Sequence, residues 1–261
     1  ILLSQETVQE YLRSNICLLE KMIESNYEDS KSISRRINDM KNWLKKPTLI
    51  QPDSNAQYEE IIEIDLAKVK QPIVACPNDP DNVKEITDVA NTNIDEVFIG
   101  SCMTNIGHFR AAGKLLENVK SSLPTRLWIS PPTRMDKFQL EEEGFYKIYE
   151  NADVRTEVPG CSLCMGNQAR VEPNCTVVST STRNFPNRLG DGANVYLSSA
   201  ELAAISSILG KLPSLNEYHE FMKDINTMSS DIFRYMNFNE IASYKKAASE
   251  AVLPSVTIES N

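Results

Sequence analysis

The sequence predicts an α/β protein with a mostly parallel sheet and helices on both faces, preceded by a mostly helical segment. From residue 96 onward, short apolar runs of strand length alternate with helical segments, which is typical of a parallel sheet covered by helices. Residues 4–46 instead repeat apolar side chains at three- and four-residue steps, which indicates helix. A chain of 261 residues can bury a sizeable core in one or two domains.

The first predicted domain, residues 1–75, is mostly helical. Two periodic helical stretches stop before Pro47, and polar and proline residues then predict a loop. A turn cluster at 77–82 places the domain boundary within 70–85. The expected elements are helix over 4–46, a loop over 47–58, and short strands over 61–66 and 73–75.

The second predicted domain, residues 76–247, contains the alternating strands and helices, and 248–261 form a C-terminal tail. The expected strands are 96–100, 126–129, 154–158, 176–179 and 195–197. The expected helices are 106–119, 134–143, 200–209 and 215–225.

Three cysteines follow predicted strands: Cys102 comes after the strand at 96–100, and Cys161 and Cys164 come after the strand at 154–158. Ligands of open α/β sheets gather outside the carboxyl ends of the strands. Four thiolates would complete a structural zinc site or an electron-transfer cluster. Three leave one metal position open to water or substrate, where a metal acts as a Lewis acid. The pattern therefore favours a [4Fe–4S] cluster with three protein ligands.

The same cysteines are also compatible with three other arrangements. A zinc site would need a fourth ligand from Cys76, Cys175 or His108. A redox dithiol would need only Cys161 and Cys164, and would leave the remaining cysteine of the three without a role. The third alternative is that these cysteines are ordinary buried residues that bind no metal.

Two arginines, Arg183 and Arg188, follow the strand at 176–179 in a segment rich in hydroxyl groups, with no carboxylate before Asp191. Guanidinium groups bind carboxylates in a bidentate manner. Beside an open Lewis acid, two of them suit a small polycarboxylate. The alternative is that both are solvated or pair with nearby acidic residues.

Four further residues are candidates for supporting contacts. Ser101, Asn105 and Asn167 would donate hydrogen bonds to sulfide or carboxylate, although an asparagine that caps a helix gives the same pattern. His108, near a predicted helix start, would orient substrate or donate to a sulfide; the alternative is an ordinary polar residue on a helix.

Charge and composition argue against three classes of protein: general nucleic-acid binders, membrane proteins and secreted disulfide-rich proteins. With 27 basic and 36 acidic residues, the net charge of −9 does not favour a general nucleic-acid binder. No apolar run approaches the roughly 18 residues that span a bilayer, so we expect no membrane partner. Six cysteines without dense regular spacing favour a reducing, cytoplasmic location over a secreted disulfide framework.

Three segments in this order carry a resemblance to a known family. They are GSCMTN at 100–105, GCSLCMGNQ at 160–168 and STRNFPNR at 181–188. Together they resemble the cluster and substrate motifs of the aconitase family, most closely its bacterial B branch, whose members are also 2-methylisocitrate dehydratases. The resemblance extends from the first helices to about Tyr244.

The resemblance implies a function. Cys102, Cys161 and Cys164 would hold three irons of a [4Fe–4S] cluster, and the fourth iron would bind substrate. Arg183 and Arg188 would bind substrate carboxylates. The reaction would be the reversible isomerisation of citrate to isocitrate through cis-aconitate, a step of the tricarboxylic acid cycle, without net redox change.

The chain departs from the family pattern in two places. Many aconitases have Asn where this chain has Thr182. The Gly-Ser-Ser-Arg motif of the family's serine base is not found, so we expect a C-terminal part that requires the remaining aconitase domains as partners. The resemblance then implies that residues 1–75 are the C-terminal end of a preceding α/β domain and that residues 76–247 form the cluster-bearing domain. Such a part is expected to hold a cluster without turning over substrate. Binding of messenger RNA in the cluster-free state is the alternative function.

Overall fold

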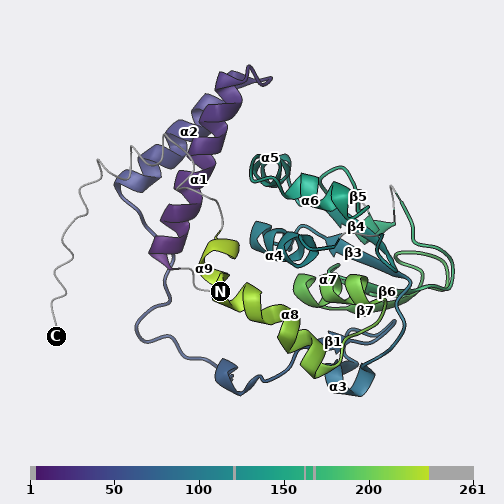
Figure 1. Cartoon of the computed structure of the whole chain (residues 1–261). Helices are drawn as coiled ribbons and strands as arrows, with labels where there is room; N and C mark the ends of the chain where they lie inside the picture. Colours follow the sequence, from purple (N-terminus) through teal and green to yellow (C-terminus); the bar gives the residue numbers. More distant parts are fainter. Residues whose placement is uncertain (1–3, 120–121, 162, 167–168, 235–261) are drawn as a thin grey trace. The chain divides into compact units, whose positions relative to one another are not determined.

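The computed structural model describes residues 4–119, 122–161, 163–166 and 169–234. They fall into two compact units, residues 4–61 and 62–234 (Figure 1). The predicted tail at 248–261 lies outside the described residues. The predicted domain boundary within 70–85 stays a prediction.

The first unit contains a helical hairpin. Helix α1 (Gln5–Glu24) begins at Ser4, whose side chain accepts a hydrogen bond from the Thr7 amide, and α2 (Ser30–Lys45) begins at Asp29 in the same manner. The two helices pack through a small apolar cluster that includes Ile16 and Ile37. The structure thus confirms the predicted helix over 4–46 and divides it into two helices that are joined by a turn.

The second unit is built on a seven-stranded sheet of order β2-β1-β7-β6-β3-β4-β5 (Figure 1). The strands are β1 (Ile73–Ala75), β2 (Val83–Glu85), β3 (Glu96–Gly100), β4 (Arg126–Ser130), β5 (Arg155–Thr156), β6 (Thr176–Ser179) and β7 (Asn194–Leu197). The strands from β7 to β5 are parallel, whereas β1 pairs antiparallel with both of its neighbours. The predicted mostly parallel α/β class is confirmed.

Helices connect these strands. They are α3 (Ile86–Val89), α4 (Ile106–Leu116), α5 (Arg134–Glu142), α6 (Phe145–Asn151), α7 (Ala200–Leu209), α8 (Leu215–Thr227) and α9 (Ser229–Ile232), with one-turn helices η1 (Leu66–Lys68) and η2 (Leu163–Met165). The predicted bounds of α7 and β6 match the structure. The elements β2, α3, α6 and α9 were not predicted, because each is too short to show a period.

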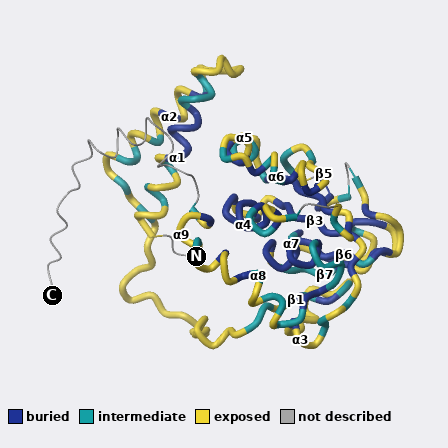
Figure 2. The backbone as a smooth tube through the Cα atoms, in the orientation of Figure 1, coloured by how far each residue is buried: buried dark blue, intermediate teal, exposed yellow. Residues whose placement is uncertain are grey.

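The prediction of a strand at 61–66 is wrong. Residues 50–70 are all exposed, and only η1 interrupts this segment (Figure 2). Apolar residues alternate with acidic ones there, but no neighbouring strand pairs with them among the described residues. By contrast, the predicted turn at 77–82 joins β1 to β2 as a hairpin.

The core divides according to the two faces of the sheet. Val97 and Ile99 belong to the cluster formed with α4 and α7, whereas Phe98 belongs to the opposite cluster. This alternation follows from the two-residue period of a strand. The prediction of helices on both faces is wrong for the opposite face, which among the described residues is covered by the loop segments around η2 and Leu189. The central strands β3, β4 and β6 are almost entirely buried, whereas the edge strands β2 and β5 are exposed (Figure 2).

A buried carboxylate connects the amino ends of the strands. Glu96 at the start of β3 accepts a hydrogen bond from the Trp128 indole nitrogen at 2.7 Å and one from the Glu172 amide at 2.8 Å. Arg155 lies over the Trp128 ring, with 4.1 Å between its guanidinium carbon and the ring centroid. We infer that Glu96 fixes the position of the segment that leads into β6, because the Glu172 amide lies in that segment.

Replacing Glu96 with alanine is therefore expected to lower the free energy of unfolding by about 2–3 kcal/mol, since each buried donor left unsatisfied costs about 1–3 kcal/mol. Urea denaturation measures this loss. Glu172→Ala is the control, because that side chain is 66% exposed and its removal should cost less than about 0.5 kcal/mol. Equal losses would contradict the assignment.

Candidate functional site

The candidate site lies where the order of the strands reverses. The chain runs from β3 outward to β4 and β5, then returns to place β6 on the other side of β3. In open α/β sheets, ligands bind outside the carboxyl ends of the strands at such a switch point. β3 leads directly into the turn of Cys102, and β6 leads into the arginine segment.

The turn after β3 has a constrained backbone. A Cβ atom on Gly100 would lie 2.6 Å from the Ser130 carbonyl oxygen, so only glycine fits. Ser101 has φ of +151°, which residues with a side chain rarely adopt. Its buried hydroxyl accepts a hydrogen bond from the Met103 amide at 3.2 Å and lies 3.0 Å from the Thr104 hydroxyl. These bonds hold the turn, and Cys102 within it is exposed.

Thr180 joins this turn to the arginine segment. Its hydroxyl accepts a hydrogen bond from the Gly100 amide and donates one to the Gly100 carbonyl, both at 2.7 Å. The Thr104 hydroxyl lies 3.4 Å from it. Sequence reasoning noted hydroxyl groups in this segment but did not single out Thr180, because its partner is 80 residues away.

The second cysteine segment is joined to the same edge. The Gly160 amide donates to the Pro131 carbonyl, in the loop after β4. Cys161 is exposed and Cys164 is buried. The Arg188 Nε donates to the Cys164 carbonyl at 2.9 Å, and a Cβ atom on Gly166 would lie 2.6 Å from the Arg188 carbonyl oxygen. The structure therefore brings the three predicted segments to one edge of the sheet.

The two arginines differ in their surroundings. Arg183 is exposed, and its Nη1 donates to the Thr182 hydroxyl at 3.0 Å. Arg188 is half-buried against the cysteine segment. Within the described residues, neither guanidinium pairs with a carboxylate; the nearby Asp191 pairs with Arg170 instead. Both predicted arginines thus retain donors for an anionic ligand.

The predicted supporting residues have distinct positions. The side chain of Ser101 is used within its own turn, as described above. Asn105 is the N-cap of α4, where its side chain accepts from the Gly107 amide at 2.9 Å, so the capping alternative is observed. Asn167 lies outside the described residues.

His108, in the first turn of α4, is held by a carboxylate that the sequence did not reveal. Its Nδ1 lies 2.6 Å from the Oε1 of Glu201 in the first turn of α7. That hydrogen bond raises the pKa of His108 above its ordinary value of 6.5. Burial would raise the pKa of Glu201, but its hydrogen bond to His108 and the imidazolium charge hold that pKa below its ordinary value of 4.5.

The directions of these two pKa shifts predict a pH dependence. A raised His108 pKa gives stability that is complete below pH 6.5 and lost as the pH rises through the folded-state pKa. A lowered Glu201 pKa gives stability that is complete above pH 4.5 and lost as the pH falls through its folded-state value. The pair is therefore expected to stabilise most between those values, by less than about 1 kcal/mol because the imidazole is partly exposed. Urea denaturation from below pH 4.5 to above pH 6.5 should therefore show a smaller loss of stability on the alkaline side for His108→Gln than for the parent chain, whereas the control His219→Gln should follow the parent chain.

The cysteine thiols can be compared with what the predicted iron–sulfur cluster and the alternative zinc site would need. All six cysteines are free thiols. Three thiols on turns at one edge suit a cluster, because each thiolate binds a different iron. In the described part of the chain, no three His, Cys, Asp or Glu side chains are placed to hold one metal ion. Burial raises the pKa of Cys175 to about 12, and this residue precedes β6 at the opposite edge, which argues against it as a zinc ligand.

Comparisons with known proteins agree on one family. Residues 20–210 match the Aconitase family (aconitate hydratase). Aconitate hydratase B of Pseudomonas aeruginosa is 58% identical over 256 residues, which cover 98% of this chain and 30% of that protein. Aconitate hydratase B of Escherichia coli is 55% identical over 248 residues, or 95% of this chain and 29% of that protein. The chain thus spans about 30% of the length of these relatives.

A more distant relative carries a different name. The 3-isopropylmalate dehydratase large subunit of Clostridium kluyveri is 36% identical over 173 residues, which cover 65% of this chain and 41% of that protein. No helix among the described residues combines the length and apolar character needed to cross a membrane.

Proposed function

Because the chain belongs to the aconitase family, we propose that it supplies the cluster-binding and carboxylate-binding part of an aconitate hydratase. The proposed ligands of a [4Fe–4S] cluster are Cys102, Cys161 and Cys164. When bound, such a cluster supplies a Lewis-acidic iron that assists departure of a hydroxyl group. The proposed reaction is the reversible dehydration and rehydration that interconverts citrate and isocitrate through cis-aconitate.

The chain's own residues would bind and orient the substrate. Arg183 and Arg188 offer planar donors to substrate carboxylates. Arg188 is already fixed by its bond to the Cys164 carbonyl, so its position is coupled to the cysteine segment. The remaining aconitase domains are the proposed partners, and they would supply the serine base.

One observation supports this proposal above the others: the three segments meet at the switch point of the sheet. Thr180 bonds the Cys102 turn to the arginine segment, and Arg188 bonds that segment to Cys164. Because the thiol groups and guanidinium groups share one edge, a metal-bound hydroxy acid could contact both.

Replacing Arg183 with lysine tests the substrate assignment. A lysine keeps the charge but loses the forked contact, so the affinity for citrate is expected to fall about tenfold, which corresponds to about 1.4 kcal/mol. Iron and sulfide content should stay unchanged in protein purified without oxygen. Arg170→Lys is the matched control, because Arg170 pairs with Asp191.

The result can contradict the proposal in two ways. Loss of iron from Arg183→Lys would show that the arginine segment serves the cluster and not the substrate. Equal citrate affinity in the parent chain and both variants would remove Arg183 from the site. Elemental analysis detects the first outcome, and calorimetric titration with citrate detects the second.

The proposal also concerns a second substrate, the cellular location and RNA binding. We propose dehydration of 2-methylisocitrate as a second activity of the same site. A cytoplasmic location is consistent with the free thiols. The alternative function is binding of messenger RNA in the cluster-free state, which the net charge of −9 does not favour.

A further inference from the structure

The imidazole of His108 is fixed on two sides. Glu201 holds its Nδ1 at 2.6 Å, and the Phe233 ring packs edge-on against it with 5.6 Å between centroids. A Cβ atom on Gly107 would lie 2.7 Å from the Phe233 Cα, so the two backbones approach as closely as they can. The first turn of α4 is thus clamped between α7 and the segment after α9.

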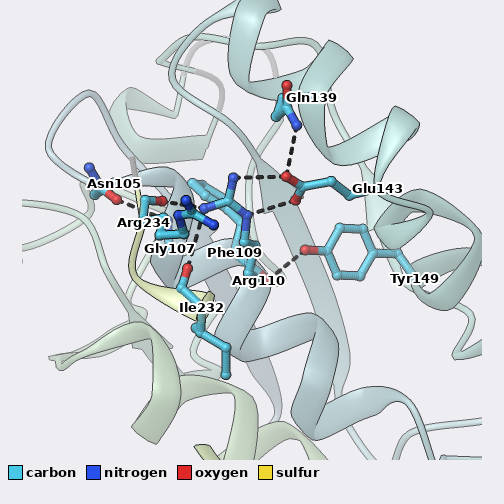
Figure 3. Close-up of polar contacts among 9 residues, drawn as sticks. All are labelled: Asn105, Gly107, Phe109, Arg110, Gln139, Glu143, Tyr149, Ile232 and Arg234. Atoms are coloured by element: carbon cyan, nitrogen blue, oxygen red, sulfur yellow. Dashed lines mark hydrogen bonds and ion pairs between the residues drawn. The ribbon is translucent and has the colours of Figure 1, made fainter. Parts of the chain in front are cut away.

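A buried arginine on α4, Arg110, holds the residues on both sides of Phe233, and Figure 3 shows it with Ile232 and Arg234. Nη1 of Arg110 donates to the Ile232 carbonyl at 3.3 Å and also to the Arg234 carbonyl. Its Nε and Nη2 donate to the two Glu143 carboxylate oxygens at 2.7 and 2.9 Å. Arg110 therefore fixes the backbone on both sides of Phe233, and so the surface that contacts His108.

This arrangement leaves one nitrogen of the imidazole available. Within the described residues, Nε2 has no hydrogen-bond partner, whereas Nδ1 is held by a carboxylate. A carboxylate behind an imidazole sets the tautomer and the orientation of the ring, and the other nitrogen then meets the ligand. His108 lies at the carboxyl edge of the sheet, six residues after Cys102.

We propose that His108 is an anion-binding residue of the site, whose Nε2–H donates a hydrogen bond to a carboxylate of the ligand. Glu201 is its positioning residue, and Phe233 and Arg110 limit the motion of the ring. The inference rests on the proposed function, because it places the same polycarboxylate at the same edge.

The exposure of the two partners separates this role from a structural one. Glu201 is 6% exposed, whereas the His108 side chain is 39% exposed. An ion pair that served only packing would gain from burying both partners, as Arg110 and Glu143 do at 4% and 6%. At His108, only the supporting carboxylate is buried, and the imidazole faces outward.

Titration of the whole chain, reconstituted with iron and sulfide without oxygen, tests the proposal. The probe is tricarballylate, a tricarboxylate without a hydroxyl group. The His108 Hε1 signal in the proton NMR spectrum is expected to move in a saturable manner, while the exposed His219 on α8 serves as an internal control and does not move. His108→Asn is expected to weaken calorimetric binding about tenfold, Glu201→Gln by a smaller factor, and His219→Asn not at all.

A structural role gives a different result. If His108→Asn lowers the melting temperature but leaves the tricarballylate affinity unchanged, and the parent His108 signal does not move, the inference is overturned. If that variant does not fold, the titration of the parent chain decides alone. Failure of the proposed function appears separately, as a parent chain that binds no iron or sulfide after reconstitution.

Discussion

Cys161→Ser is expected to abolish cluster assembly, with iron, sulfide and visible absorbance all falling to the background of an unreconstituted sample. A serine hydroxyl stays protonated near neutral pH and is a poor iron ligand, so one corner of the cluster would be lost. Cys161 is exposed, so the substitution should leave the melting temperature unchanged. Elemental analysis and a thermal melt of the same sample separate loss of the ligand from loss of the fold.

Two further substitutions make this test specific. Cys102→Ser, at the other exposed cysteine, should have the same effect. Cys175→Ala is the control, because this buried thiol lies at the opposite edge of the sheet and should leave iron binding intact. A full complement of iron in Cys161→Ser, or its loss in Cys175→Ala alone, would show that the cysteines are misassigned.

Arg110→Ala is expected to lower the free energy of unfolding by about 3–5 kcal/mol, the largest stability change predicted for this chain. The alanine would leave the Glu143 carboxylate, which is 6% exposed, without its cation. It would also remove the donor for the carbonyls of Ile232 and Arg234. Chemical denaturation followed by circular dichroism measures the loss.

The control lies one turn further along the same helix. Lys114 forms an exposed pair with Glu117, and Lys114→Ala should cost less than about 1 kcal/mol. A double replacement, Arg110→Met with Glu143→Leu, removes both buried charges and should recover much of the lost stability. If the double variant is no more stable than Arg110→Ala, the loss does not arise from an unpaired carboxylate.

The sequence predicted those parts of the fold that show a regular pattern. The strand at 176–179 and the helix at 200–209 have the bounds that their apolar pattern indicated. The apolar run at 61–66 did not become a strand, because pairing depends on a neighbour that the local sequence does not specify. Short elements such as α6 and α9 contain too few residues for a period to appear.

For the candidate site, the sequence indicated which residue types to consider and in which order they follow the strands, but it did not indicate their partners. The cysteines and arginines were proposed because their chemistry is rare and their positions follow strands. The bond between Thr180 and Gly100 spans 80 residues, and that between His108 and Glu201 spans 93. Such contacts arise from the return of β6 and β7 to the side of β3, which no local pattern encodes.

The return of β6 to the side of β3 also determines when the cysteine turn becomes supported during synthesis of the chain. A nascent chain that has emerged only as far as β5 has its first cysteine turn but no neighbour for one edge of β3. The loop closed by the Thr180–Gly100 bond must form before the turn gains that support, and closure over long separations is slow. Loading of the proposed cluster would therefore follow translation of β6, and Cys102 would remain an unligated thiol until that strand is in place.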